Sequence, residues 1–194
     1  MGEARVFEEN PQSYDADKPK TFYTIKYFQS RMGLFSFKRK ARDDRLRKFI
    51  NTNFEILLLP YWIEYIDNKI KKMELIPACF INSQFQNGAL QIWTFTFKGN
   101  KKFSKAGCKR VAVDQLKIKM KANKVLNKKI IQYSRNGHFF AETSYKQKDW
   151  FTRLWTVITQ KKMAHISYNC KLNSQDVDQK QVTQIVDSFR FKGK

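Results

Sequence analysis

Histidine and cysteine are scarce in this chain, and their scarcity restricts the chemistry it could perform. The 194 residues include only two histidines, His138 and His165, and three cysteines, Cys79, Cys108 and Cys170. Neither histidine has another histidine, a cysteine or an acid at a metal-binding spacing. The odd number and wide spacing of the cysteines do not resemble a disulfide framework. We therefore expect an intracellular protein in a reducing compartment, the cytoplasm.

The sequence motifs of several enzyme classes are also missing. No GxGxxG, GxxxxGK[ST], GxSxG or CxxC occurs, so the chain offers neither a phosphate-cradling loop nor a nucleophile elbow. His165 and Cys170 are five residues apart in a predicted strand, where they point to opposite faces and cannot act as a thiol–imidazole pair. We predict no catalytic residues, no metal, no cofactor and no enzyme activity.

Long apolar runs are absent as well. The first residues, MGEARVFEENPQSYDAD, contain acids where a signal peptide has its apolar core, and no later run is long and apolar enough to cross a bilayer. We therefore expect neither a secretory signal nor a membrane span.

Positive charge, by contrast, is in large excess. The chain has 38 basic and 17 acidic residues, a formal net charge of +21. Such a field attracts acidic proteins, nucleic acids and anionic membranes without specifying which of them is the partner. A lysine-rich surface of no special purpose is the alternative. Because 42% of the residues are hydrophobic, the chain can bury one substantial core, which favours one domain with an N-terminal extension.

The predicted extension comprises residues 1–50, and the predicted domain comprises residues 51–194. Met1 to about Lys20 carries acids and two prolines. This segment is either an exposed arm or an arm that lies across the basic surface and competes with a ligand for it. The run TFYTIKYF, Thr21 to Phe28, is aromatic and β-branched, which is typical of a strand.

Two basic clusters are candidates for contact with an anionic partner. The first lies in KRKARDDRLRKFI, from Lys38 on, and enters a predicted short helix near Asp43. The second lies on an amphipathic helix predicted between Phe103 and Lys129, whose cations recur at i, i+7, i+11 and i+14. The opposite side of this helix is an apolar stripe of Ala112, Val113, Leu116 and Met120. Ordinary solvated lysines are the alternative to a binding role. The candidate partner-binding residues are Lys38, Arg39, Lys40, Arg45, Arg47, Arg110, Lys117, Lys121 and Lys124.

Strands and hairpin turns are predicted for most of the remaining domain. The run FEILLL, Phe54 to Leu59, is typical of a buried strand that ends at Pro60. A second alternating strand covers Leu90 to Phe97. Polar turns predict hairpins at Arg135-Asn136-Gly137 and at Gln160-Lys161-Lys162.

A helix is predicted to close the domain. In SQDVDQKQVTQIVDSF, an apolar stripe recurs at i, i+3, i+4 and i+7, and it consists of Val182, Ile185, Val186 and Phe189. Asp176 and Gln179 have the spacing of a capping box at its start. Because a hairpin and one helix are marginal alone, we expect them to cover a larger sheet.

The order of these elements resembles the PsbP-like superfamily. A strand ends in Leu59-Pro60 before Tyr61-Trp62, a meander, a helix and hairpins follow, and the terminal helix closes with VDSFRF, Val186 to Phe191. The superfamily includes the photosystem PsbP proteins, a Ran-binding nuclear import regulator and bacterial DcrB-type proteins. The resemblance covers about Phe54 to Phe191. It implies an α+β fold with a mainly antiparallel sheet sandwiched by helices, and members that bind protein partners without catalysis. No functional residue transfers, and the strong basicity departs from the family.

Two functions from different classes are compatible with these features. The leading hypothesis is a non-enzymatic binding module that docks an acidic protein partner, as an adaptor, chaperone, immunity protein or assembly subunit. The alternative is a nucleic-acid-binding or ribonucleoprotein component, in which both basic clusters contact phosphates. Aromatic residues beside the first cluster suit base stacking. However, no RNP-like octapeptide, zinc-finger spacing or KH-type GxxG accompanies them.

Overall fold

The computed structural model describes residues 46–65, 77–82, 88–97, 102–125, 128–172 and 175–193. All of them belong to one compact unit, residues 35–194. The predicted acidic arm, the predicted strand at Thr21 to Phe28 and the predicted helix near Asp43 lie outside the described residues.

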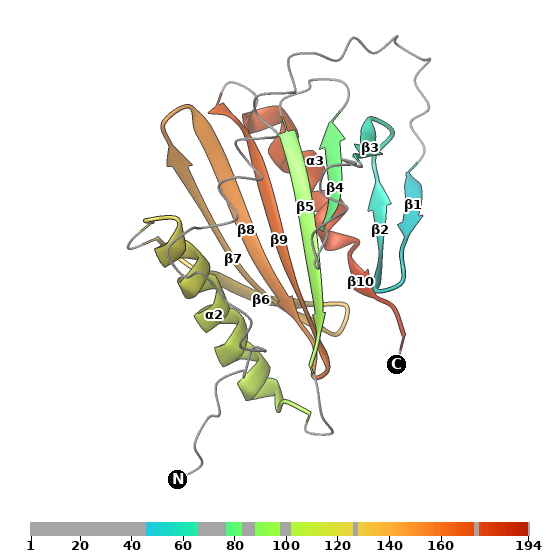
Figure 1. The fold of residues 1–194 in the computed structure, drawn as a ribbon, viewed down its shortest axis with the longest axis vertical. Helices are drawn as coiled ribbons and strands as arrows, with labels where there is room; N and C mark the ends of the chain where they lie inside the picture. The colour runs from blue at the N-terminus through green and yellow to red at the C-terminus, as the bar shows by residue number, and fades with distance from the viewer. Residues whose placement is uncertain are drawn as a thin grey trace, which may run out of the picture. The chain divides into compact units, whose positions relative to one another are not determined.

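A seven-stranded antiparallel sheet forms the centre of this unit (Figure 1). Its spatial order is β3-β4-β5-β9-β8-β7-β6. The sheet therefore consists of two groups of consecutive strands, β3 to β5 and β6 to β9, which join where β5 pairs with β9. The strands are β3 (Trp62–Glu64), β4 (Ala78–Asn82), β5 (Gly88–Thr96), β6 (Ile131–Arg135), β7 (His138–Gln147), β8 (Trp150–Ile158) and β9 (Lys162–Lys171).

Both predicted hairpins are confirmed, and local chemistry explains their turns. Strands β6 and β7 are joined by Asn136 and Gly137, which have φ of 53° and 76°. These are the positive values that a type I′ turn requires and that Asn-Gly supplies at low cost. Between β8 and β9, the Thr159 hydroxyl accepts a hydrogen bond from the Lys162 backbone N–H at 3.0 Å. Every residue from Met163 to Cys170 is buried, because β9 lies in the middle of the sheet and is covered on both faces.

A small three-stranded sheet packs on one side of the large sheet. It comprises β1 (Arg47–Ile50), β2 (Phe54–Leu58) and β10 (Arg190–Phe191), with β2 in the middle. The predicted buried strand before Pro60 is confirmed as β2. Strand β1 lies in the last residues of the predicted extension and pairs with β2. The described end of the first basic cluster is thus a strand and not a helix.

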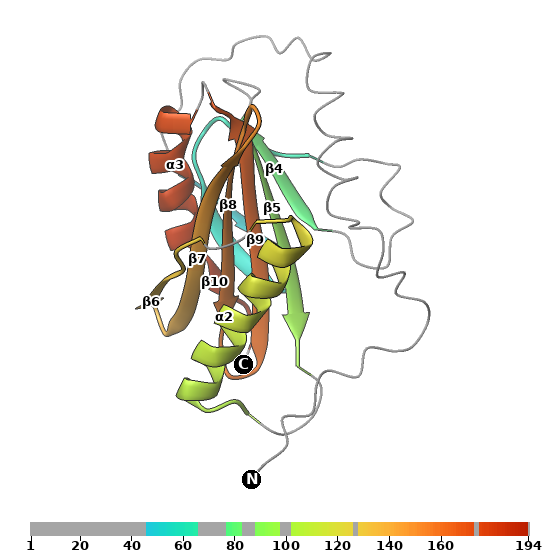
Figure 2. The same ribbon diagram turned by 90° about the vertical axis from the view of Figure 1, so that its left-hand side faces the viewer.

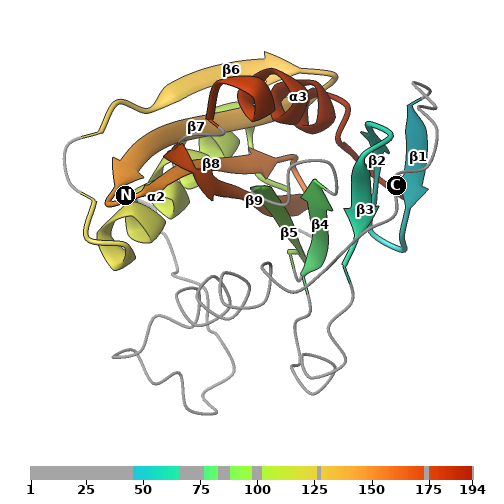
Figure 3. The same ribbon diagram turned by 90° about the horizontal axis from the view of Figure 1, so that it is seen from above.

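Two helices cover opposite faces of the large sheet, as Figures 2 and 3 show. Helix α2 (Lys105–Ala122) packs on β7 and β8, whereas α3 (Gln175–Asp187) lies on the other face beside the small sheet. The core on the α3 side contains the predicted stripe, whose four residues, Val182, Ile185, Val186 and Phe189, are at most 1% exposed. The predicted capping box involves Asp176, whose side chain is not described. The predicted α+β class, a mainly antiparallel sheet sandwiched by helices, is confirmed.

Candidate partner-binding surface

Helix α2 is fixed to the sheet by one apolar side. Ser104 caps its start, and the Ser104 hydroxyl accepts a hydrogen bond from the Gly107 backbone N–H at 3.0 Å. The residues that the helix buries recur every four positions, and they are Cys108, Ala112, Leu116 and Met120. They pack in a core with Leu154 and Ile158 of β8. The predicted apolar stripe is confirmed, although Val113 is only half-buried. The helix therefore presents its opposite side in one fixed orientation.

That opposite side of α2 carries exposed cations, and more of them follow the helix. We call the basic surface the exposed side chains of Arg110, Lys117 and Lys121 of α2, together with Lys124, Lys128 and Lys129, which come after it. Asp114 is the acid among the described residues of this stretch. The sequence predicted four of the cations, and all four are exposed. Lys124 differs from its prediction in one respect, because α2 ends at Ala122 and Lys124 follows the C-cap with a φ of 55°.

An exposed aliphatic side chain lies among these cations. Ile118 of α2 is 60% exposed and follows Lys117 directly. Helical periodicity did not single it out, because it belongs neither to the apolar stripe nor to the series of cations. A lone exposed isoleucine is common on protein surfaces. Here it gives the basic surface an apolar contact point.

Lys119 differs from its neighbours on α2 because its amine lies over the sheet. Its Nζ is 5.3 Å from the ring centroid of Trp93, a cation–π arrangement. Burial lowers the pKa of Lys119 to about 8. The desolvated amine also contributes to the low pKa of nearby His165, although burial of the imidazole is the main cause. The period of α2 places Lys119 on the sheet-facing side, seven residues after Ala112, but its contact with Trp93 depends on where β5 lies in the sheet.

The first basic cluster is only partly described. Lys38, Arg39, Lys40 and Arg45 lie outside the described residues. The Arg47 guanidinium donates hydrogen bonds to the backbone carbonyls of Pro60 at 2.8 Å and Trp62 at 3.0 Å. Arg47 thereby ties β1 to the turn between β2 and β3. It belongs to the small sheet on the α3 side, so it does not join the basic surface of α2.

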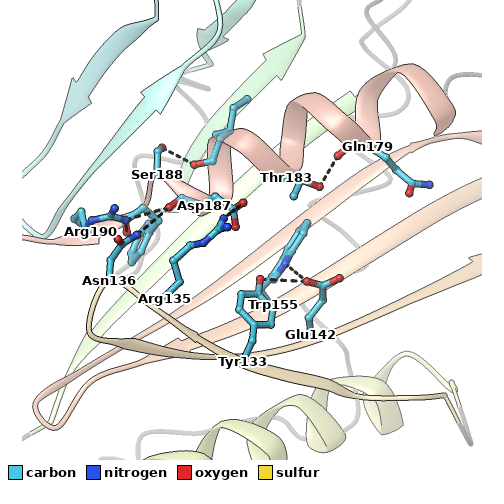
Figure 4. Close-up of polar contacts among 12 residues, drawn as sticks. Tyr133, Arg135, Asn136, Glu142, Trp155, Gln179, Thr183, Asp187, Ser188 and Arg190 are labelled. Carbon is cyan, nitrogen blue, oxygen red and sulfur yellow. Dashed lines mark hydrogen bonds and ion pairs between the residues drawn. The ribbon is translucent and has the colours of Figure 1, made fainter.

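A buried carboxylate holds the sheet and α3 together. Glu142 of β7 accepts hydrogen bonds from the Trp155 indole N–H at 2.8 Å and the Tyr133 hydroxyl at 3.2 Å (Figure 4). It also pairs with Arg153 at 2.7 Å, and Arg153 in turn donates to the Thr183 hydroxyl of α3 at 2.8 Å. Burial, followed by the charge of Glu142, raises the pKa of Tyr133 to about 12. These contacts satisfy the carboxylate, which is typical of a structural ion pair.

Both histidines have structural surroundings. The His138 Nδ1–H donates to the Asn136 carbonyl at 2.7 Å, and its Nε2 accepts from the Phe191 backbone N–H at 3.4 Å. Burial lowers the pKa of His138, which suits a neutral ring with one donor and one acceptor. His165 and Cys170 lie on opposite faces of β9, because Cys170 packs in the α3-side core while His165 contacts Phe95. The predicted absence of a direct pair between them is confirmed.

The described residues contain no helix long and apolar enough to cross a membrane. Within the same residues, no three histidine, cysteine or acidic side chains gather where they could hold a metal ion.

The overall chain trace resembles solved structures. The solution structure of the cyanobacterial PsbP protein CyanoP from Synechocystis sp. PCC 6803 matches with a TM-score of 0.54 and 13% identity, over 82% of this chain and 99% of that chain. The fold is PsbP-like. The resemblance inferred from the order of elements is thus confirmed at the level of the fold.

A second similar structure is a crystal structure from Bacteroides thetaiotaomicron VPI-5482. It matches with a TM-score of 0.50 and 15% identity over 76% of this chain, which spans 48% of the length of that protein. No protein-family model matches the sequence, and no curated protein does. At these identities the PsbP-like fold is shared, while partner and site residues are not transferred.

Proposed function

We propose that this PsbP-like protein is a non-enzymatic binding module that docks an acidic protein partner on its basic surface. The observation that carries the proposal is the exposed side of α2, where cations greatly outnumber acids on a helix fixed by its buried stripe. A surface on which cations predominate, carried by a helix that is fixed by its packing, steers an oppositely charged partner toward it and fixes the orientation of the complex. Adaptor, chaperone, immunity protein and assembly subunit are the roles compatible with this chemistry, and the cytoplasm is the compartment we propose.

The exposed apolar side chains favour a protein partner over a nucleic acid. Single-stranded nucleic acids bind where bases stack on exposed aromatic rings. Among the described residues, the large hydrophobic side chains that are exposed are all aliphatic: Leu46, Ile50, Ile118 and Ile131. An isoleucine among lysines can pack against an apolar side chain of a protein, but it forms no favourable contact with a phosphate. The described surface therefore suits an acidic protein that has some apolar side chains.

Charge reversal on α2 tests this proposal. The test variant is Lys117→Glu, Lys121→Glu, Lys124→Glu. The matched control is Lys146→Glu, Lys161→Glu, Lys171→Glu, which reverses three exposed lysines outside α2 and changes the total charge by the same amount. Each protein is used to capture partners from the native lysate after nuclease treatment, and is titrated with RNA and duplex DNA at several salt concentrations.

We expect nuclease-resistant capture of an acidic protein by the wild type and the control, and loss of this capture by the test variant. Tight, steeply salt-dependent binding of nucleic acid, lost only in the test variant, would support the alternative function instead. In that case log affinity should fall with log salt, and the slope should be shallower in the test variant by about 0.7 to 0.9 for each of the three reversed lysines.

A further inference from the structure

Strand β6 ends the large sheet with an edge that no other described strand pairs with. It pairs with β7 over its whole length without a bulge, from Ile131 opposite Glu142 to Arg135 opposite His138. Four of its five residues are exposed. At the other end of the sheet, β3 has only three residues. Strand β6 is therefore the longer of the two edges.

The turn after β6 determines which backbone groups this edge presents. In a two-residue hairpin, the two residues that flank the turn form a hydrogen-bonded pair, and such pairs alternate along an antiparallel ladder. Here the flanking pair is Arg135 with His138, so Tyr133 and Ile131 also bond to β7. The backbone N–H and C=O groups of Gln132 and Ser134 must then point away from β7, toward the open edge.

The usual protection of an edge strand is weak at β6. Proteins block open edges with proline, with bulges or with charged side chains. Strand β6 has no proline, its register is continuous, and its one charged residue, Arg135, is held in an ion pair with Asp187 of α3. Figure 4 shows Arg135 directed toward α3 rather than toward the edge. An added strand could pair with β6 without displacing a described element.

The stretch of chain that includes β6 is basic, and β6 itself exposes one apolar side chain. Residues 115–141 contain no acid and seven cations, which are Lys117, Lys119, Lys121, Lys124, Lys128, Lys129 and Arg135. Ile131 is 50% exposed and lies on the same side of the strand as Tyr133, because side chains two apart share a face. Gln132 and Ser134 face the α2 side. The Lys119 amine lies over Trp93 and Arg135 is paired with Asp187, so an incoming strand would meet the exposed Lys128 and Lys129 and one exposed isoleucine.

We propose that an extended, acidic segment of the protein partner adds to β6 as a further strand of the large sheet. This inference rests on the proposed function, because it specifies how the acidic partner docks. Backbone hydrogen bonds to Gln132 and Ser134 supply the affinity, an apolar side chain of the segment covers Ile131, and its acids pair with Lys128 and Lys129, the exposed cations of the basic surface that precede β6. Strand addition of this kind gives affinity through the main chain and specificity through alternate side chains.

A second copy of the chain is a poorer occupant of the same edge. The chain has a formal net charge of +21, and a net charge far from zero keeps copies of a protein apart. The positive charge therefore favours an acidic segment over self-association.

The test uses a synthetic probe, a capped heptapeptide of alternating glutamate and valine labelled with a fluorophore. Binding is measured by anisotropy against the wild type, Ser134→Pro and Ser134→Ala. Proline removes one outward N–H and spares the ladder with β7, whereas alanine removes the same hydroxyl and keeps the N–H. Hydrogen exchange of the Gln132 and Ser134 amides is followed with and without the peptide.

We expect at least tenfold weaker binding to Ser134→Pro, a change of less than twofold for Ser134→Ala, and slower exchange of both amides in the complex. If Ser134→Pro does not fold, peptides N-methylated at alternate positions replace it. Two peptides are compared, one methylated at its odd positions and the other at its even positions. Only the peptide whose methylated N–H groups face β6 should fail to bind.

The proposal would be overturned if the peptide did not bind, or if it bound folded Ser134→Pro as well as the wild type. It would also be overturned if both methylated peptides bound. So would self-association of the protein that Ser134→Pro abolishes. A partner that is lost from the α2 charge-reversal variant but retained by Ser134→Pro would refute strand addition while leaving the proposed function intact. If both the α2 charge-reversal variant and Ser134→Pro kept the partner, strand addition and the proposed function would both be refuted.

Discussion

Replacing Glu142 by glutamine should destabilise the protein strongly, because it removes the charge that compensates a buried guanidinium. The side chains of Glu142 and Arg153 are only 9% and 15% exposed. Breaking a buried ion pair by removing one partner costs about 3–5 kcal/mol. Arg153 keeps its hydrogen bond to Thr183 and its position 4.7 Å over the Trp155 ring. We therefore expect a loss near the lower end, about 3 kcal/mol in the free energy of unfolding.

Urea unfolding at pH 7, followed by circular dichroism, measures this loss. The matched control is Glu55→Gln, which breaks the exposed pair of Glu55 with Lys48 and should cost less than about 1 kcal/mol. Arg153→Met should also be destabilising, because it leaves the carboxylate unpaired. The double variant should cost at least about 1 kcal/mol less than the sum of the two single variants. The reasoning fails if Glu142→Gln costs no more than the control, or if the two single losses simply add.

Three further predictions concern the core, a buried amine and bound metals. Ile185 is 1% exposed, so Ile185→Asp should cost several kcal/mol in the free energy of unfolding; a melting temperature within two degrees of the wild type would contradict the packing of α3. Because the pKa of Lys119 is lowered to about 8, the unfolded chain binds more protons between about pH 8 and 10.4, and stability should rise with pH across that range. Lys119→Met should therefore raise the urea midpoint at pH 7 by more than at pH 10, and equal differences at both pH values would show that the amine is not desolvated. Elemental analysis of the purified native protein should find no stoichiometric metal. A tightly bound metal would contradict this prediction, which is based on the absence of metal-ligand spacings in the sequence.

Elements whose signal is local could be predicted from the sequence. The stripe of Val182, Ile185, Val186 and Phe189 is confirmed as buried. Its first three residues lie in α3, where the helical period decides their packing, and Phe189 is buried two residues after the end of that helix. The Asn136-Gly137 hairpin could be predicted because its turn requires positive φ, which asparagine and glycine adopt readily, and both residues have positive φ in the structure. The exposed position of Arg110, Lys117 and Lys121 also follows from the 3.6-residue period of α2, since the buried stripe fixes which side faces outward.

Features that depend on pairing across the sheet could not be predicted from the sequence. Lys119 precedes the buried Met120, and only the position of β5 decides that its amine lies over Trp93. Glu142 alternates like any strand residue, and its burial depends on the register that brings β8 and α3 to it. The edge at β6, with which no other described strand pairs, follows from the spatial order of the strands, which no residue of β6 encodes.

The pairing of β10 with β2 has a consequence for folding during synthesis. The Ser188 hydroxyl accepts a hydrogen bond from the Leu57 backbone N–H across 131 residues of sequence, and Phe191 pairs with Phe54. Contacts of such long range slow folding, because a large loop must close before they form. Strands β6 to β9 are consecutive hairpins and can pair as they leave the ribosome. The small sheet cannot be completed until residues 188–191 have also emerged, so the apolar side of β2 stays without its cover for most of the time that the chain takes to be made.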